Sequence, residues 1–65
     1  MILKFNTEIY SQKGVFKAIK AYKNLANFKL SEKGRYFIVS GTTKLKNKEL
    51  LKNEFLNFVL ANIKQ

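Results

Sequence analysis

The sequence contains no cysteine, no histidine, no aspartate and no proline in its 65 residues. Without cysteine the chain can form no disulfide, which fits a reducing compartment. Without cysteine, histidine and aspartate it also lacks the usual ligands of a metal cage, so we expect no metal site and no cofactor. A chain this short buries only about 60% of its unfolded surface, which predicts one domain spanning residues 1–65 with marginal stability.

Reactive side chains are scarce as well. General acid–base catalysis at neutral pH relies on histidine or on a pair of carboxylates, and the carboxylate side chains here are four glutamates. Glu49 and Glu54 would lie about 140° apart on a helix. A serine or threonine nucleophile would have no base beside it, and the segment "SGTTK" lacks the glycine spacing of a phosphate-binding loop. We therefore expect that the protein is not an enzyme.

Long apolar runs are also missing. No segment approaches the roughly 20 residues that a membrane-spanning helix needs. Met1 leads directly into a strand-like pattern, with no basic stretch followed by an apolar core, so a signal peptide is not expected. These features predict a soluble, cytoplasmic protein without a membrane partner.

Positive charge is abundant. The chain has 13 lysine and arginine residues against four glutamates, which gives a formal net charge of +9. This imbalance favours an anionic partner, such as nucleic acid or an acidic protein. However, every basic residue except Arg35 is lysine, and lysine lacks the planar fork that reads base edges. A solvated coat of lysines is the alternative interpretation.

A strand and a helix are predicted in the first part of the chain. Leu3 and Phe5 alternate with polar residues, as in a half-buried strand. Ser11 can begin a helix, because its hydroxyl can accept a hydrogen bond from a first-turn N–H. Phe16 lies beside the lysines of this helix, either at the edge of the core or available for stacking on a base. The apolar stripe of the amphipathic helix consists of Val15, Ala18, Ile19, Tyr22, Leu25 and Ala26.

The segment "NFKLSEKGRYFIVSG" predicts a β-hairpin. Phe28 and Leu30 alternate with polar residues, residues 32–34 form the turn, and Gly34 supplies a positive φ. The returning strand, residues 36–39, is apolar on both faces, which favours a central position in the sheet.

The register of this hairpin stays open. A three-residue loop aligns Tyr36 and Ile38 with the apolar side of the first strand. A four-residue loop aligns Phe37 and Val39 with that side instead.

The order strand, helix, strand, strand, helix predicts an α+β fold, a β-α-β-β-α two-layer sandwich. Asn47 is the expected cap of the final helix. Because a crossover between parallel strands is right-handed, the third strand can insert between the first two. We therefore predict a three-stranded antiparallel sheet of order 1-3-2 with both helices on one face. This arrangement resembles the split βαβ half of a ferredoxin-like fold with one helix added.

The final helix carries more apolar surface than one sheet can cover. A broad arc can pack on the sheet, and it consists of Leu50, Leu51, Phe55, Phe58, Val59 and Ala61. Leu56, Leu60 and Ile63 form a second seam, which we call the C-terminal seam. It packs either on the first helix or on a partner, and Asn53 and Asn57 border it, as interface amides or as solvated side chains.

Two segments resemble the small HxsD-type proteins of the His-Xaa-Ser peptide-modification systems, which accompany radical-SAM maturases. The first is "YSQKGVFKAIKAY", with Tyr10-Ser11 followed by Ala18 and Tyr22. The second is "NEFLNFVL", similar to the closing "EFxNxLL" helix of that family. Together they cover about a third of the chain. The resemblance implies a non-catalytic accessory protein that binds a peptide or a maturation enzyme, and it assigns no site residues.

The sequence thus predicts a small, non-catalytic interaction module. It is expected to bind a protein or peptide partner and to self-associate as a homo-oligomer through the C-terminal seam. The alternative is weak, sequence-tolerant binding of nucleic acid phosphates. The residues expected to contact such an anionic partner are Lys13, Lys17, Lys20, Lys23, Lys29, Lys33 and Arg35.

Overall fold

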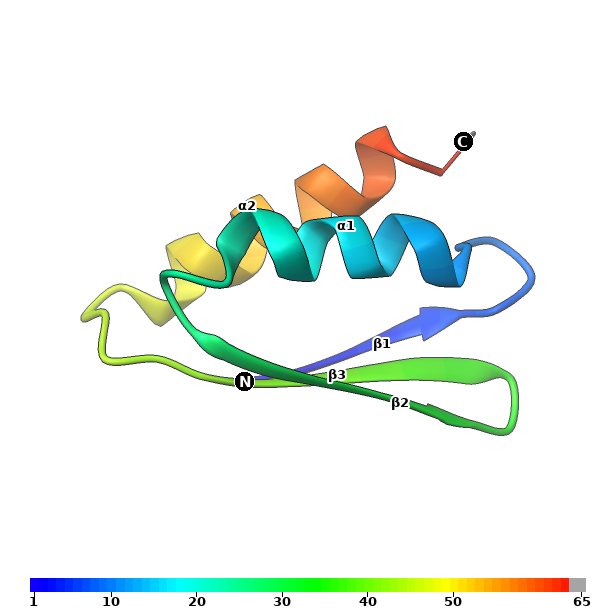
Figure 1. Cartoon of the computed structure of the whole chain (residues 1–65), viewed down its shortest axis with the longest axis horizontal. Coiled ribbons are helices and arrows are strands. Elements are labelled where there is room, and N and C mark those ends of the chain that lie inside the picture. The colour runs from blue at the N-terminus through cyan, green and yellow to red at the C-terminus, as the bar shows by residue number, and fades with distance from the viewer. Residues whose placement is uncertain (64–65) are drawn as a thin grey trace.

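The computed structural model describes residues 1–63 and contains three strands and two helices. In chain order these are β1 (Ile2–Asn6), α1 (Gln12–Tyr22), β2 (Asn27–Lys33), β3 (Tyr36–Thr42) and α2 (Lys48–Ala61). The strands form one antiparallel sheet of order β1-β3-β2. Both helices lie on the same side of this sheet (Figure 1). The predicted α+β architecture and its strand order are confirmed.

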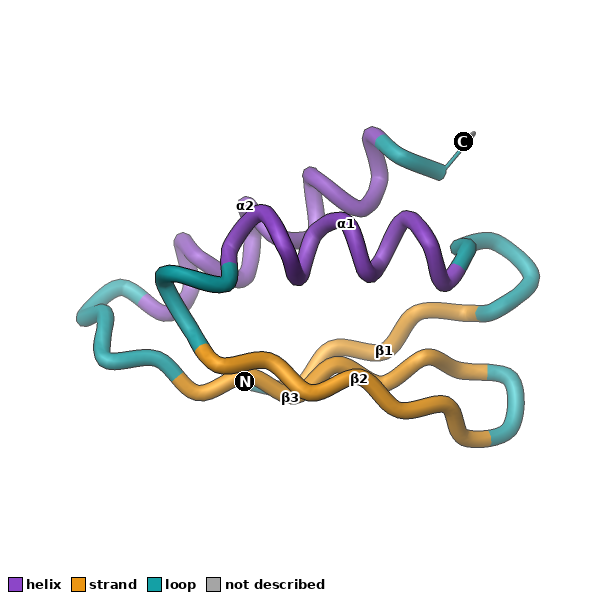
Figure 2. The backbone as a smooth tube through the Cα atoms, viewed as in Figure 1, coloured by secondary structure: helices purple, strands orange, loops and turns teal. Residues whose placement is uncertain are grey.

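Strand β3 occupies the centre of the sheet, as its apolar character on both faces predicts. Phe37 and Val39 face the helices and are buried, whereas Tyr36 and Ile38 alternate with them and face the other side. Figure 2 shows that the helices leave this other side uncovered. We call the uncovered side the open face of the sheet.

The hairpin register is set by a two-residue turn. Lys33 pairs with Tyr36, so the turn is Gly34-Arg35, and the sequence prediction of a turn at residues 32–34 is wrong. Gly34 has a φ of 62°, and no other residue has a positive φ among residues 1–63. A positive φ at the first central position alone is the type II′ pattern, whose twist matches that of the strands.

Neither of the two loop lengths left open by the sequence is observed. The four-residue option nevertheless predicts correctly that Phe37 and Val39 face the helices. Leu30 pairs with Val39, and Phe28 pairs with Gly41. A two-residue loop and a four-residue loop differ by an even number, so both direct the same side chains inward. At Gly41 a Cβ atom would lie 3.0 Å from the Phe28 ring, so the glycine allows this ring to approach the central strand.

The first helix begins where the sequence predicts and ends earlier. The Ser11 hydroxyl accepts a hydrogen bond from the Gly14 N–H at 3.0 Å, which confirms the cap. The helix stops at Tyr22, and the predicted extension to Ala26 is wrong. Asn24 in the turn that follows has a side chain that competes for backbone hydrogen bonds and favours turns. Leu25 therefore leaves the apolar stripe and is exposed.

The second helix is capped by Asn47, whose side chain accepts a hydrogen bond from the Leu50 N–H at 3.0 Å. Its buried face is narrower than the predicted arc, because Leu50 and Ala61 are exposed. The start of α1 crosses closely over the end of α2. A Cβ atom at Gly14 would lie 3.3 Å from the Asn62 carbonyl oxygen.

The core lies between the sheet and the helices and, within residues 1–63, contains no buried polar or charged side chain. Its central buried cluster consists of Leu3, Phe5, Val15, Ala18, Phe37, Val39, Phe55 and Val59. No helix in this part of the chain has the length and apolar character needed to cross a membrane.

Candidate binding surfaces

The structure divides the C-terminal seam. Leu56 is partly buried and packs against the core, and Ile63 is partly buried beyond the end of α2. Leu60 is 50% exposed. Asn53 and Asn57, which border the seam, are exposed. The seam thus presents one large, half-exposed apolar side chain to a partner, less than the sequence pattern indicates.

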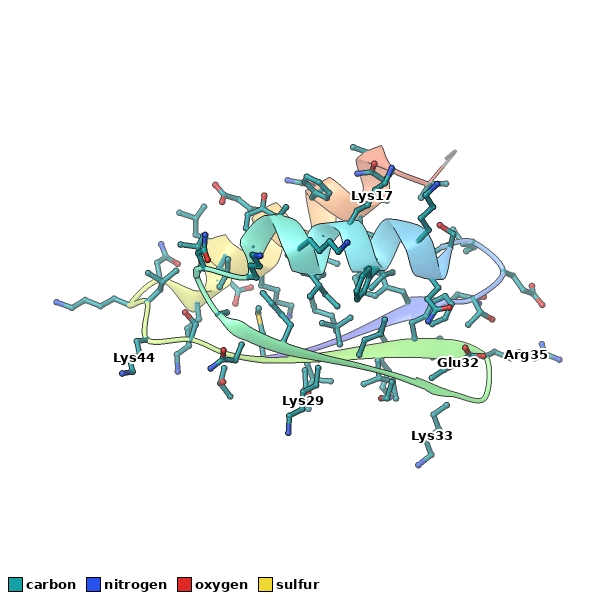
Figure 3. All side chains as sticks on the ribbon, in the orientation of Figure 1. Lys17, Lys29, Glu32, Lys33, Arg35 and Lys44 are labelled. Carbon is teal, nitrogen blue, oxygen red and sulfur yellow. The ribbon has the colours of Figure 1, made fainter. Side chains whose placement is uncertain are left out.

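The basic residues predicted to contact an anionic partner fall on two separate surfaces. Lys29 and Lys33 extend from β2 away from the helices, and Arg35 lies in the turn at the end of the hairpin (Figure 3). The other group lies along α1 and its C-terminal cap, in the helical layer, and consists of Lys13, Lys17, Lys20 and Lys23. We call this second group the lysine row. No single flat partner can contact both surfaces at once.

Phe16 lies on the surface of α1 and is about half exposed. The Nζ atom of Lys20 lies 5.1 Å from the centroid of its ring, within the range of a cation–π interaction. The ring thus lies beside the lysines of the helix, and its stacking on a base stays a prediction.

The glutamates are dispersed over the molecule. Glu8 lies in the turn after β1, Glu32 lies in β2, and Glu49 and Glu54 lie in α2. Within residues 1–63 there is no cluster of three side chains of the types that bind metals. Glu54 is exposed, and its carbonyl oxygen lies 3.5 Å from the Tyr22 hydroxyl.

Three leucines converge at the end of the molecule where α1 leads into β2 and β3 leads into α2. Leu25 follows α1, Leu45 precedes α2, and Leu50 lies in the first turn of α2. They are 44%, 40% and 53% exposed. Leu25 and Leu45 line two adjoining hollows of about 510 and 200 Å³, and Leu50 lines the smaller one. We call this surface the leucine groove.

Charged side chains surround the leucine groove. Lys23 and Lys44 line the larger hollow, and Lys46 and Glu54 line the smaller one. Lysines therefore outnumber carboxylates around an apolar floor. Such a combination suits a partner in which apolar side chains are accompanied by negative charge.

Thr43 joins the two chain segments that form the leucine groove. Its hydroxyl donates a hydrogen bond to the Leu25 carbonyl oxygen at 2.6 Å. The N–H of Leu45 donates to the same hydroxyl oxygen at 3.1 Å. Because these bonds tie the connection after α1 to the connection before α2, the groove is formed without a ligand. A preformed groove lowers the entropic cost of binding.

Sequence patterns do not reveal this site, because its members come from the connection after α1, the connection before α2 and the first turn of α2. Leu25 and Leu50 fit the apolar stripes of the two helices, and this pattern predicts core positions for both. One signal was available, since Leu45 is the single apolar residue in the polar segment "GTTKLKNK".

The two segments that resemble HxsD-type proteins meet inside the molecule. The rings of Tyr22 and Phe55 are 6.0 Å apart between centroids, and the ring of Tyr10 packs edge-on against Phe5 at 5.0 Å. Ala18 is completely buried. Most residues that carry the resemblance thus pack in or against the core. Their role in the fold is to hold the two helices on the sheet.

Comparisons of the chain with protein-family models, with curated proteins and with solved structures found no match. The resemblance to HxsD-type proteins therefore stays a prediction from the sequence.

Proposed function

We propose that the protein is a non-catalytic binding module that docks a protein or peptide partner in the leucine groove. The observation that carries this proposal is the convergence of Leu25, Leu45 and Leu50, each about half exposed, on one groove. Small soluble proteins rarely leave large apolar side chains together on the surface, and such patches mark interaction sites. A 65-residue domain needs apolar side chains for its core, so three leucines outside it on one groove favour a binding role.

The groove selects a partner by both apolar contact and charge. Covering the exposed halves of three leucines contributes on the order of 1 kcal/mol for each side chain. The lysines at its border add attraction for carboxylates and speed the encounter. The expected occupant is a segment with one or two bulky apolar side chains flanked by glutamate or aspartate.

Two observations on the sequence support a binding role without catalysis. The chain has no histidine and no aspartate to act as a base, and its glutamates lie apart. The resemblance to HxsD-type accessory proteins implies the same class of function, because those proteins are expected to bind a peptide or a maturation enzyme.

A peptide-display selection tests the proposal. A random 12-residue library is selected on the immobilised protein, and binders are then measured against the Leu45→Gln variant. We expect enriched peptides that combine a bulky apolar residue with acidic neighbours. Their affinity should fall at least tenfold for Leu45→Gln, which removes an apolar anchor of the groove.

The matched control is Leu60→Gln, the same exchange at a leucine of similar exposure on α2. This variant should bind the selected peptides like the parent protein. Equal loss in both variants, or no enrichment over the Leu45→Gln protein, would refute docking in the leucine groove.

Self-association through the C-terminal seam is a second candidate, favoured by the exposure of Leu60. Sedimentation at concentrations from micromolar to hundreds of micromolar tests it. If the seam mediates assembly, the parent chain forms dimers and Leu60→Asp is a folded monomer. A parent protein that sediments as a monomer throughout this range contradicts the candidate.

A further inference from the structure

The open face of the sheet is a second surface that no helix covers, and the pairing of its strands determines which residues it presents. Lys4 and Ser31 flank Ile38, one on each side, and Lys33 pairs with Tyr36. Because side chains alternate along a strand and Phe37 and Val39 point toward the helices, these residues point away from them.

Charge on this face has one sign. Lys4, Lys29 and Lys33 are exposed, and in Figure 3 the labelled side chains of Lys29 and Lys33 extend away from the helical layer. None of the glutamates belongs to this face. Glu8 lies in the turn after β1, Glu32 alternates with the open-face residues of β2, and the remaining two lie in α2.

An aromatic ring lies at the hairpin end of this face, where β3 begins. Tyr36 is 45% exposed on the central strand, beside Lys33, and Ile38 continues the apolar strip along the same strand. Lys29 and Lys33 are four residues apart on β2, or about 13 Å, and Lys4 on β1 lies two strand spacings, or about 10 Å, from Ser31 between them. Lys33 therefore lies beside the ring on β2, and on β1 the cation Lys4 lies two residues further along the strip, beside Ile38.

This combination discriminates between occupants. A second copy of the chain would bring the same three lysines against their equivalents, which is repulsive. A duplex keeps its bases stacked inside, where Tyr36 cannot reach their faces. A single strand offers both unstacked bases for an aromatic ring and phosphates for lysines.

We propose that the open face of the sheet binds single-stranded nucleic acid, with a base stacked on Tyr36 and the phosphates held by Lys4, Lys29 and Lys33. Binding is tolerant of sequence, because stacking reads no base edge. This site is distinct from the leucine groove, and each proposal can fail without the other.

Fluorescence of a Tyr36→Trp variant tests the stacking step, since this tryptophan would be the only one in the chain. Titration with a 12-nucleotide oligo(dT) should quench its emission. Three phosphate contacts to a single strand predict a slope of about −2 for log affinity against log salt. The affinity for labelled oligo(dT) is also measured by anisotropy for the parent protein and two variants. Tyr36→Ala should bind about tenfold more weakly than the parent, and Tyr36→Phe should bind about as tightly as the parent.

Two double variants separate this site from general attraction. Lys29→Glu with Lys33→Glu changes the open face, and Lys13→Glu with Lys20→Glu changes the lysine row. Each exchange removes two units of charge, so both proteins fall from +9 to +5. We expect the first pair to lose at least tenfold in affinity for oligo(dT) and the second pair to lose less than threefold.

The proposal is overturned by equal losses in the two double variants, or by a larger loss in the lysine-row pair. It is also overturned if a 12-base-pair duplex binds as tightly as the single strand and leaves the emission of Tyr36→Trp unchanged. Circular dichroism of each variant confirms that the compared proteins are folded.

Discussion

Among residues 1–63, Phe55 contacts the largest number of other aromatic rings. Its side chain is fully buried, and its ring centroid lies 5.0 Å from that of Phe28, 6.0 Å from Tyr22 and 6.4 Å from Phe5. One ring from α2 therefore joins β1, β2 and α1. Removing it would leave a cavity lined by rings from β1, β2 and α1.

We predict that Phe55→Ala is unfolded at 25 °C. Truncation of a buried phenylalanine costs about 3–5 kcal/mol, which equals or exceeds the stability expected of a domain this small. Far-ultraviolet circular dichroism and amide chemical-shift dispersion measure the outcome. The control is Phe16→Ala, the same exchange at a half-exposed ring, which should keep the fold. A folded Phe55→Ala protein of near-parental stability contradicts this assignment of the core.

Gly34 is the residue on which the hairpin turn depends. Its φ of 62° lies in the left-handed region, where a Cβ atom is strained, although the space around it is open. We predict that Gly34→Ala lowers the free energy of unfolding by about 1 kcal/mol, and that Gly34→Asn lowers it less. Urea denaturation measures both. Equal stability of the alanine variant and the parent would show that the turn has another conformation.

The element scale shows which features local sequence chemistry determines. Both helix starts were predicted, because Ser11 and Asn47 provide side-chain acceptors next to an apolar pattern. The end of α1 was not, because Leu25 and Ala26 continue the helical periodicity past Tyr22. The helix ends before these residues because the chain must turn into β2 and direct Phe28 toward the core, and this requirement outweighs the helical periodicity.

The hairpin shows the same limit. The sequence indicates a glycine turn and two strands, but not the number of residues between them. Lys33 and Arg35 are equally polar, so polarity alone cannot locate the turn. Only the pairing of Lys33 with Tyr36 fixes it at Gly34-Arg35. The leucine groove could not be predicted from the sequence for a different reason. It depends on how two connections that are separate in the chain approach each other in space.

Capping predicts a measurable effect on α2. Asn47→Ala removes the acceptor for the Leu50 N–H and should lower the stability by about 0.5–2 kcal/mol. Asn47→Ser keeps a side-chain acceptor and should retain most of the parent stability. Thermal unfolding followed by circular dichroism compares the three proteins. Alanine and serine variants that unfold at the same temperature would contradict the capping role.

At the scale of the whole molecule, the net charge of +9 is distributed over a body of only 32 × 22 × 17 Å. Lysines occupy α1, the open face and the border of the leucine groove, so like charges surround the protein on several sides. Self-repulsion of this kind destabilises a compact state. It is also what makes an anionic partner favourable on more than one surface.

Salt should therefore stabilise the protein. Between about 0.01 M and 0.1 M salt the screening length falls from about 30 Å to about 10 Å, from the length of the molecule to a fraction of it. A gain on the order of 0.5 kcal/mol would raise the Tm by about 2–4 °C. Differential scanning calorimetry measures it. The less charged variant with Lys13→Glu and Lys20→Glu should respond less, and a parental Tm that falls with salt would contradict the argument.

The position of β3 between β1 and β2 favours one order of assembly. Hairpin β2–β3 closes over two residues, whereas β1 must join β3 across about 30, which carries a larger loop-closure entropy. We infer that the β2–β3 hairpin forms first and that β1 pairs with β3 afterwards. During translation β1 and β2 emerge before either has a neighbour, so a ribosome-bound chain acquires its sheet only when β3 has left the exit tunnel.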